Sequence, residues 1–335
     1  MGSAMALPFA DRDFDVHLVG SQLDGAIVER VRLDNFHPRL NLTLPKAVTS
    51  FTHDAYVEDH SDLILLGVAS AGISWGIEKL ASVLKKPTEI LMITKGLSSQ
   101  MEALPNVVAG ALKQKLGFSV PVAAIAGPCI AGELAVRRPT ATVIVSHDFS
   151  LAHRLCDALC TDYYQPRPSM DVIGAEICAA FKNFFAISVG WAHGALERLP
   201  SVDNKALNNN AAAILFAQAI REMMVLVKAF GGSPESVWGM PGAGDLYVTC
   251  QAGRNSRLGN HLGRGLTYKE VKQGPMKDDT VEGAELGLAI AQSLQGMIGM
   301  GKLKAENLPL TLALLDVFQN NTSFNPPWDA FQRSS

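Results

Sequence analysis

Short apolar runs that end at glycine or small polar residues constrain the fold of this chain more than any other feature. They occupy residues 16–19, 63–68, 89–94, 122–126 and 140–146. Nearly every residue in them is apolar, as in strands covered on both faces, and helical or loop patterns separate most of them. The first half is therefore predicted to form a parallel, doubly wound α/β sheet.

The strand pattern fades after residue 168, and the second half has the pattern of an all-helical domain. Helices are predicted at residues 171–198, 209–230, 267–272, 281–298 and 308–319. The stretch from Tyr163 to Pro168 holds two prolines where the pattern changes, and proline ends the element before it. We place the boundary there, which gives an α/β domain at residues 1–168 and a helical domain at residues 169–330.

Charge and composition exclude several classes of protein. The 335 residues carry a net charge of −3, so no overall field recruits nucleic acid or an anionic membrane. The longest apolar stretch, residues 177–189, contains Lys182 and Asn183 and falls short of the roughly 18 residues of a membrane span, so a core helix is predicted. The five cysteines lack zinc spacing and the N-terminus lacks a signal pattern. We therefore expect no metal site, reduced and mostly buried thiols, and a cytoplasmic protein.

Two lysines stand out as candidate catalytic groups. Lys95 directly follows the predicted strand at residues 89–94, and doubly wound sheets bind ligands beyond the carboxyl ends of their strands. The plain alternative is a solvated surface lysine. Lys182 shares an apolar helix face with Phe185 and Val189. Burial there disfavours the charged ammonium, which suits a general base, whereas the alternative is a side chain that extends to water.

Two glycine-rich stretches are candidates for binding an anion. Gly242 and Gly244 precede Asp245, and Arg254 and Asn255 follow a further glycine. Backbone amides left open by glycine, together with a guanidinium, match the geometry of phosphate. Such loops are common, so they are weak evidence alone. The later stretch Thr280-Val281-Glu282 is explained adequately by a helix N-cap.

Separate sequence blocks follow one another in a recognisable order. They are Thr94-Lys95-Gly96-Leu97, Ala126-Gly127-Pro128, Asp171-Val172-Ile173-Gly174 with Lys182-Asn183, Gly242-Ala243-Gly244-Asp245-Leu246 with Thr249-Cys250, Gly253-Arg254-Asn255, and Val281-Glu282-Gly283. In order and spacing, over nearly the whole chain, they resemble the NAD(P)-dependent glycerol-3-phosphate dehydrogenase family.

The resemblance implies a Rossmann-like dinucleotide-binding domain that uses NAD or NADP and a helical domain that binds a small phosphorylated substrate. The implied reaction interconverts sn-glycerol 3-phosphate and dihydroxyacetone phosphate and feeds glycerophospholipid synthesis. Lys182 would be the general base at the C2 oxygen, Lys95 would polarise that oxygen, and Arg254 and Asn255 would bind the phosphate. The implied substrate contacts are Lys95, Gly127, Cys129, Asn183, Asp245, Thr249, Arg254 and Asn255. The implied cofactor contacts are Gly2, Ser70, Lys95, Ala131, Arg254 and Glu282. A homodimer is expected, as is common among members.

The chain departs from the family pattern at its start. The family opens with a strand and a Gly-x-Gly-x-x-Gly turn, but Met1 falls just before the place of the third glycine, Gly2. We expect the first, central strand to be missing, which would leave both neighbouring strands with unpaired backbone groups. We favour a start site assigned too far downstream over an evolved loss. The missing turn keeps open a non-catalytic relative that binds a phosphorylated metabolite.

Two further departures concern specificity. Ser21 offers neither an acid for the ribose hydroxyls nor a base for a 2′-phosphate, so the choice between NAD and NADP stays open. Ala212, Ala217 and Gln218 stand where polar or basic residues are common in the family. They keep open a dehydrogenase of another small phosphorylated or hydroxylated substrate.

Overall fold

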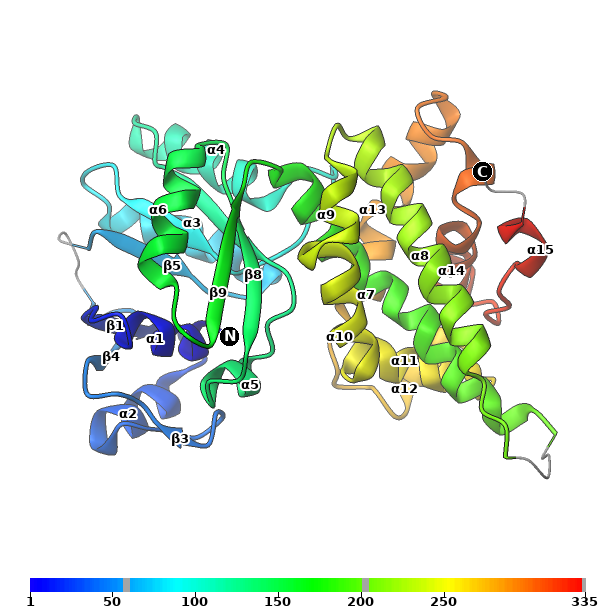
Figure 1. The fold of residues 1–335 in the computed structure, drawn as a ribbon, viewed down its shortest axis with the longest axis horizontal. Coiled ribbons are helices and arrows are strands. Elements are labelled where there is room, and N and C mark those ends of the chain that lie inside the picture. The colour runs from blue at the N-terminus through cyan, green and yellow to red at the C-terminus, as the bar shows by residue number, and fades with distance from the viewer. Residues whose placement is uncertain (57–60, 201–204, 333–335) are drawn as a thin grey trace. The chain divides into compact units, whose positions relative to one another are not determined.

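The computed structural model describes residues 1–56, 61–200 and 205–332, which divide into two compact units (Figure 1). Unit 1 consists of Met1–Lys95 and Leu104–Val172, and unit 2 consists of Gly96–Ala103 and Ile173–Ser335. The chain thus enters unit 2 briefly after Lys95, returns to unit 1, and enters unit 2 again at the start of a long helix. The expected Rossmann-like α/β half and helical half are confirmed.

A five-stranded sheet forms the centre of unit 1. Its strands, in spatial order, are β5 (Leu63–Leu66), β6 (Glu89–Met92), β7 (Val122–Ala126), β8 (Thr140–Val145) and β9 (Tyr164–Ser169). The pairs β5–β6, β6–β7 and β8–β9 are parallel, whereas β7 and β8 are antiparallel. The predicted apolar strands are therefore confirmed, with one antiparallel pair in a sheet that was expected to be wholly parallel.

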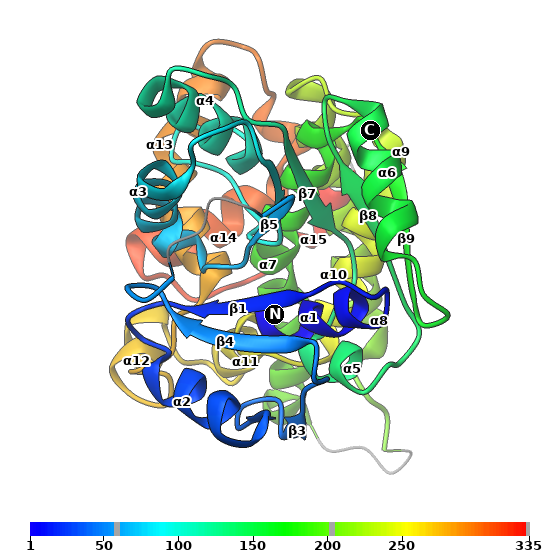
Figure 2. The ribbon, with the colours of Figure 1, turned by 90° about the vertical axis from the view of Figure 1, so that its left-hand side faces the viewer.

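Two further strands of unit 1 form a separate sheet. The strands β1 (Val16–Gly20) and β4 (Val48–Thr52) pair in parallel, and Figure 2 shows them side by side and apart from β5. Between them in the chain lies a short antiparallel hairpin of β2 (Phe36–His37) and β3 (Leu42–Thr43). Within the described residues, no strand pairs with the second edge of β1 or with the outer edge of β5.

Within its described residues, unit 1 contains six α-helices. They are α1 (Gly2–Ala10), α2 (Gly25–Asp34), α3 (Ile73–Val83), α4 (Leu104–Leu116), α5 (Ala131–Ala135) and α6 (Phe149–Leu159). The first of them, α1, begins at Gly2. Met5 and Phe9 of α1 share one apolar core with Leu91, Ile125 and Leu155, so this helix packs into the same core as β6, β7 and α6.

The proline-rich stretch at the expected domain boundary is a strand, which corrects the prediction of a break there. β9 is an edge strand that pairs only with β8. The carbonyl oxygens of Tyr163 and Ser169 accept hydrogen bonds from the backbone N–H groups of Thr140 and Ser146. The backbone N–H and C=O groups of the odd-numbered residues of β9 therefore point toward β8. Pro166 and the proline two residues later therefore lie where an N–H would point away from the sheet, and an edge strand tolerates proline in that position.

Unit 2 is helical, as predicted. Its helices are α7 (Val172–Ala195), α8 (Asn209–Ala229), α9 (Pro234–Trp238), α10 (Asp245–Gln251), α11 (Arg254–Gly263), α12 (Tyr268–Gln273), α13 (Glu282–Gly299), α14 (Pro309–Asn320) and α15 (Trp328–Phe331). By length and composition, the stretches 172–198 and 209–229 would suffice to cross a membrane, but 83% of the first apolar window is buried inside the protein. Both contribute to the core of unit 2, so the prediction of a core helix is confirmed.

Glycines bring the backbones of α7 and α11 into direct contact. A Cβ built on Gly194 would lie 1.9 Å from the carbonyl oxygen of Asn260, and one on Gly259 would lie 1.9 Å from that of Ile187. Ordinary side chains do not fit between helices this close. The contact sets the distance between the central residues of α7 and the first turn of α11, where several predicted site residues lie.

The cysteines are mostly buried, as expected. Cys156, Cys178 and Cys250 are buried, and none of the five cysteines, all of which the structure describes, forms a disulfide. Burial raises the pKa of the Cys156 thiol and of the Cys250 thiol to about 12, which keeps both groups protonated and unreactive.

Candidate functional site

An ion pair between Lys182 and Asp245 is the centre of the site in unit 2. The Lys182 Nζ lies 2.5 Å from the Asp245 Oδ1, and the two side chains are only 12% and 3% exposed. Lys182 is in the middle of α7 and Asp245 is the first residue of α10. The lysine is therefore mostly enclosed, with only a small part of its side chain exposed, in line with the predicted apolar surroundings. A buried carboxylate offsets much of the cost of burying the ammonium and fixes its position.

The turn before α10 explains why Asp245 points inward. Residues Met240–Gly244 form one π-helical turn, and a Cβ on Gly242 would lie 2.1 Å from the carbonyl oxygen of Val237. Only glycine permits this close approach of the turn to α9. Four residues beyond Asp245, the Thr249 hydroxyl donates a 2.6 Å hydrogen bond to the Asp245 carbonyl oxygen, within the first turns of α10.

A second polar connection joins α7, α11 and α13. The Asn255 Nδ2 donates to the Asn183 Oδ1 over 3.1 Å, and the Asn255 Oδ1 accepts from the backbone N–H of Gly283 over 2.9 Å. Asn255 is buried. The structure thus uses Asn255 to hold Asn183 in place next to Lys182, a positioning role that its predicted place in a phosphate loop did not reveal.

Arg254 and Glu282 form an exposed ion pair beside this connection. Arg254 opens α11 directly after Gly253, whose φ of +113° is in the region that favours glycine. Glu282 opens α13. The exposed Arg254 guanidinium is thus paired with Glu282, and an incoming anion would meet it at a helix N-terminus.

The predicted site residues of unit 1 gather at the carboxyl ends of β5, β6 and β7. The Lys95 Nζ donates a 2.9 Å hydrogen bond to the carbonyl oxygen of Gly127, the first residue after β7. Two residues further, the Cys129 Sγ lies 3.8 Å from the Met1 Sδ. Ligands of doubly wound sheets bind at this edge.

The start of α1 lies at the same edge. A Cβ on Gly67, directly after β5, would lie 3.1 Å from the Cα of Gly2, so the two backbones are in close contact. The first hydrogen bond inside α1 is donated by Ala4, which leaves the amides of Gly2 and Ser3 outside the helical ladder. Ser70 begins an exposed 3-10 turn after β5, and Ala131 opens α5 after β7.

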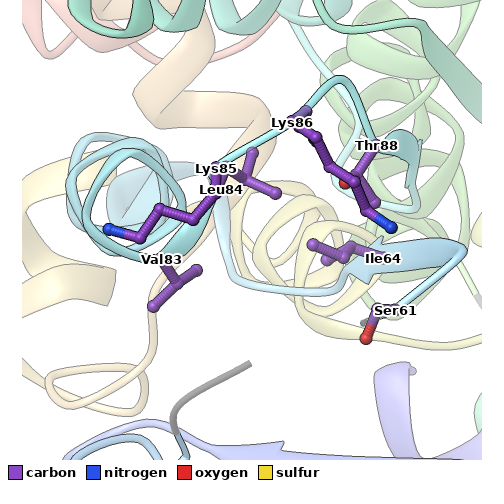
Figure 3. Close-up of a pocket in the computed structure, with 7 residues that line it drawn as sticks. All are labelled: Ser61, Ile64, Val83, Leu84, Lys85, Lys86 and Thr88. Atoms are coloured by element: carbon purple, nitrogen blue, oxygen red, sulfur yellow. Dashed lines mark hydrogen bonds between the residues drawn. The ribbon is translucent and has the colours of Figure 1, made fainter. Parts of the chain in front are cut away.

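Figure 3 shows the lining of a pocket in unit 1, and several of these residues lie at or near the starts of the strands. Ser61 and Ile64 line it at the start of β5, and Thr88 lines it just before β6, together with Lys85 and Lys86. None of the predicted site residues lines it. Because the strands are parallel, this pocket is remote from the edge at which Lys95 and Gly127 lie.

Two buried carboxylates of unit 2 were not predicted. Glu176 on α7 accepts a hydrogen bond from the backbone N–H of Gly96, and Glu222 on α8 accepts four hydrogen bonds at the start of α14 and from Gln218. The signal that would have found them is an acidic residue on an apolar helix face. Gln218 is buried, and its Nε2 donates a 2.8 Å hydrogen bond to the Glu222 Oε1.

Within the described residues, no group of three or more histidine, cysteine or acidic side chains has the arrangement of a metal site. The geometry therefore consists of a buried lysine–carboxylate pair, an amide that is held beside it, and an arginine at a helix N-terminus in unit 2. Unit 1 presents a second lysine and the N-terminus of α1 at the edge of a sheet.

The sequence of the chain matches two family models and several known proteins. Residues 1–152 match the family described as NAD-dependent glycerol-3-phosphate dehydrogenase N-terminus, and residues 171–328 match its C-terminus. The NADP(+)-dependent glycerol-3-phosphate dehydrogenase of Archaeoglobus fulgidus is 32% identical over 275 residues, which cover 82% of this chain and 80% of that protein. The NAD(P)+ glycerol-3-phosphate dehydrogenase of Corynebacterium aurimucosum is 30% identical, with 90% and 91% covered.

Solved structures agree on the architecture. The crystal structure of glycerol-3-phosphate dehydrogenase from Coxiella burnetii has a TM-score of 0.77 at 26% identity and covers 99% of this chain and 94% of that one. The glycerol-3-phosphate dehydrogenase from Saccharomyces cerevisiae has a TM-score of 0.80 at 19% identity, covers 99% and 96%, and supports the fold alone.

Proposed function

The chain belongs to the NAD-dependent glycerol-3-phosphate dehydrogenase family, and from that premise we propose that it interconverts sn-glycerol 3-phosphate and dihydroxyacetone phosphate. NADH or NADPH would supply the hydride to C2 of dihydroxyacetone phosphate, and NAD or NADP would accept it from C2 of sn-glycerol 3-phosphate in the reverse direction. The observation on which the proposal depends most is the buried contact between Lys182 and Asp245. An ammonium held by a carboxylate in a water-poor site is a positioned proton donor and, once deprotonated, a positioned base.

Lys182 transfers the proton of the substrate C2 oxygen in this proposal. In the direction of reduction, the ammonium donates a proton to that oxygen as the carbonyl becomes an alcohol. In the direction of oxidation, the neutral amine removes it. Asp245 fixes the Nζ atom and compensates the charge that Lys182 gains and loses. Lys95 donates a hydrogen bond to the same oxygen from its place after β6, in exchange for the one that it gives to Gly127.

The remaining substrate contacts follow from the residues around the ion pair. Asn183, Asp245 and Thr249 would orient the substrate hydroxyls, while Gly127 and Cys129 would contact the substrate from unit 1. Arg254 and Asn255 would bind the phosphate, and the phosphate would then compete with Glu282 for the Arg254 guanidinium. Asn255 would support this site from within, through its hydrogen bonds to Asn183 and Gly283.

The edge of the unit 1 sheet fits a dinucleotide in two respects. The backbone amides of Gly2 and Ser3 at the N-terminus of α1 can bind a pyrophosphate, and Gly67 allows the close packing that places these amides at the edge of the sheet. The other residues that would hold the cofactor are Ser70, Lys95, Ala131, Arg254 and Glu282. We propose residues 1–168 as the dinucleotide-binding domain and residues 169–330 as the substrate domain of a cytoplasmic homodimer that supplies glycerophospholipid synthesis.

A steady-state assay tests this function. We expect the protein to oxidise NADH or NADPH with dihydroxyacetone phosphate, and the nucleotide with the higher kcat/KM decides the cofactor preference. Dihydroxyacetone without the phosphate is the matched control, and it should be much poorer because Arg254 then has no anion to bind. No turnover with either nucleotide, or equal turnover of both substrates, would contradict the proposal.

A further inference from the structure

The fully buried side chain of Glu176 has no part in the proposed reaction so far. It lies on α7, six residues before Lys182. Its Oε2 accepts a 2.9 Å hydrogen bond from the backbone N–H of Gly96. A buried carboxylate is costly unless donors compensate it. We therefore ask what the backbone group that Glu176 binds contributes to the site.

That group belongs to the peptide unit that joins Lys95 to Gly96. Gly96 contributes the N–H of this peptide, which Glu176 binds, and Lys95 contributes the carbonyl group. Gly96 has a φ of +137°, a backbone conformation that favours glycine. The Glu176 carboxylate therefore binds the peptide that directly precedes this unusual backbone conformation.

The rest of the loop is held in unit 2 at separate points. Met101 is buried in the helical core, and the Ser293 hydroxyl on α13 donates a 3.0 Å hydrogen bond to the Ser99 carbonyl oxygen. Leu97 and Ala103 close the loop with an antiparallel bridge. Among these contacts, the one from Glu176 is closest in the chain to Lys95. It bears most directly on the backbone from which the Lys95 side chain extends.

We propose that Glu176 is a positioning residue for Lys95. By binding the Lys95–Gly96 peptide, it fixes the origin of the side chain whose ammonium approaches the C2 oxygen of the substrate. The inference rests on the proposed function, because that function assigns Lys95 its role. A displacement of about 1 Å at a catalytic group reduces the rate by about 10². Loss of the Glu176 contact should therefore lower kcat.

Two variants of Glu176 separate positioning from folding. Glu176→Met keeps the length of the side chain and removes the acceptor, and replacement of a buried charge by an apolar side chain of similar volume is often neutral for stability. We expect its kcat for dihydroxyacetone phosphate to fall about 10- to 100-fold. Glu176→Gln keeps an acceptor oxygen and should restore most of kcat.

Glu222→Gln is the matched control. Glu222 is also fully buried in unit 2 and also accepts backbone N–H groups, from Leu310 and Thr311, both over 2.7 Å. This variant should lose stability and keep its kcat at a temperature at which it is folded. If Glu176→Met does not fold, Glu176→Asp, which withdraws the carboxylate by one methylene, must show the selective loss of kcat.

The outcomes are distinct. A folded Glu176→Met protein with unchanged kcat overturns the inference, and so does a loss of kcat in Glu222→Gln of the same size. If the unmodified protein does not turn over dihydroxyacetone phosphate at all, the proposed function is refuted, and with it the role of Glu176. A loss of kcat that Glu176→Gln restores supports the inference.

Discussion

The contact between α7 and α11 predicts that Gly259→Ala is strongly destabilising. The added Cβ would lie 1.9 Å from the carbonyl oxygen of Ile187, whereas ordinary contacts begin at 3.4 Å. The two backbones would have to separate by about 1.5 Å, because neither side of the contact is a flexible side chain. Overpacking of this kind typically lowers the free energy of unfolding by about 1–3 kcal/mol, and we expect a loss near 3 kcal/mol because the atom in contact belongs to the backbone of α7.

The same separation would reach the site. Asn255 is four residues before Gly259 and Asn183 is four residues before Ile187, so their 3.1 Å hydrogen bond lies one helical turn from the added methyl group. A shift of about 1.5 Å would break it. We therefore expect Gly259→Ala to lower kcat/KM for dihydroxyacetone phosphate as well as stability.

Urea-induced unfolding measures the loss of stability, and Gly296→Ala is the matched control. Gly296 is an exposed glycine of α13 with no atom within 4 Å of a built Cβ. Alanine there should stabilise the protein by about 0.5–1 kcal/mol through helix propensity. If Gly259→Ala is as stable as Gly296→Ala, the helices do not touch as closely as described and the reasoning fails.

Three further predictions concern charged groups of unit 2. Burial raises the pKa of Glu222 to about 7, whereas in the unfolded chain this carboxyl has its ordinary pKa of 4.5. Between these two pH values the folded protein keeps a proton that the unfolded chain has released. The free energy of unfolding should therefore fall by about 3 kcal/mol as the pH rises from 4.5 to 7. Glu222→Gln should abolish that slope in pH-dependent urea titrations, and an unchanged slope would contradict it. Asp245→Asn leaves the Lys182 ammonium without its carboxylate and should cost about 3–5 kcal/mol in the same titrations, while a loss below 1 kcal/mol would show that the pair is solvated. Arg254→Ala should raise the KM for dihydroxyacetone phosphate by about 10- to 100-fold, the worth of charge-assisted hydrogen bonds, and Glu282→Gln should lower the inhibition constant of inorganic phosphate; unchanged constants would remove Arg254 from the phosphate site.

The sequence predicted those parts of the fold that local patterns determine. Apolar runs identify β7 and β8 because both faces of these strands are buried, and α7 is evident from its length and its apolar face. β9 was missed because Pro166 and Pro168 read as a break in any local window. Only its place at the edge of the sheet makes two prolines compatible with a strand, and that place depends on residues far apart in the chain.

The site was predictable as a set of residues but not as a set of contacts. Lys182 is conspicuous as a charge on an apolar helix face, yet its partner Asp245 is 63 positions later and follows a π-helical turn that local patterns do not predict. Asn255 is predicted to contact the phosphate because it follows Gly253 and Arg254, but its hydrogen-bond partners were not predicted. Its burial against Asn183 and Gly283 depends on the crossing of three helices.

The role of Lys182 is the central claim, and single-turnover kinetics of Lys182→Ala test it most directly. The variant should bind dihydroxyacetone phosphate and reduced nucleotide, because Arg254 and the edge of the unit 1 sheet are unchanged. Its rate of reduction should fall by about 10² to 10⁴, the usual contribution of a general acid or base. A Lys182→Ala protein that converts bound dihydroxyacetone phosphate to sn-glycerol 3-phosphate at the unmodified rate would contradict the account.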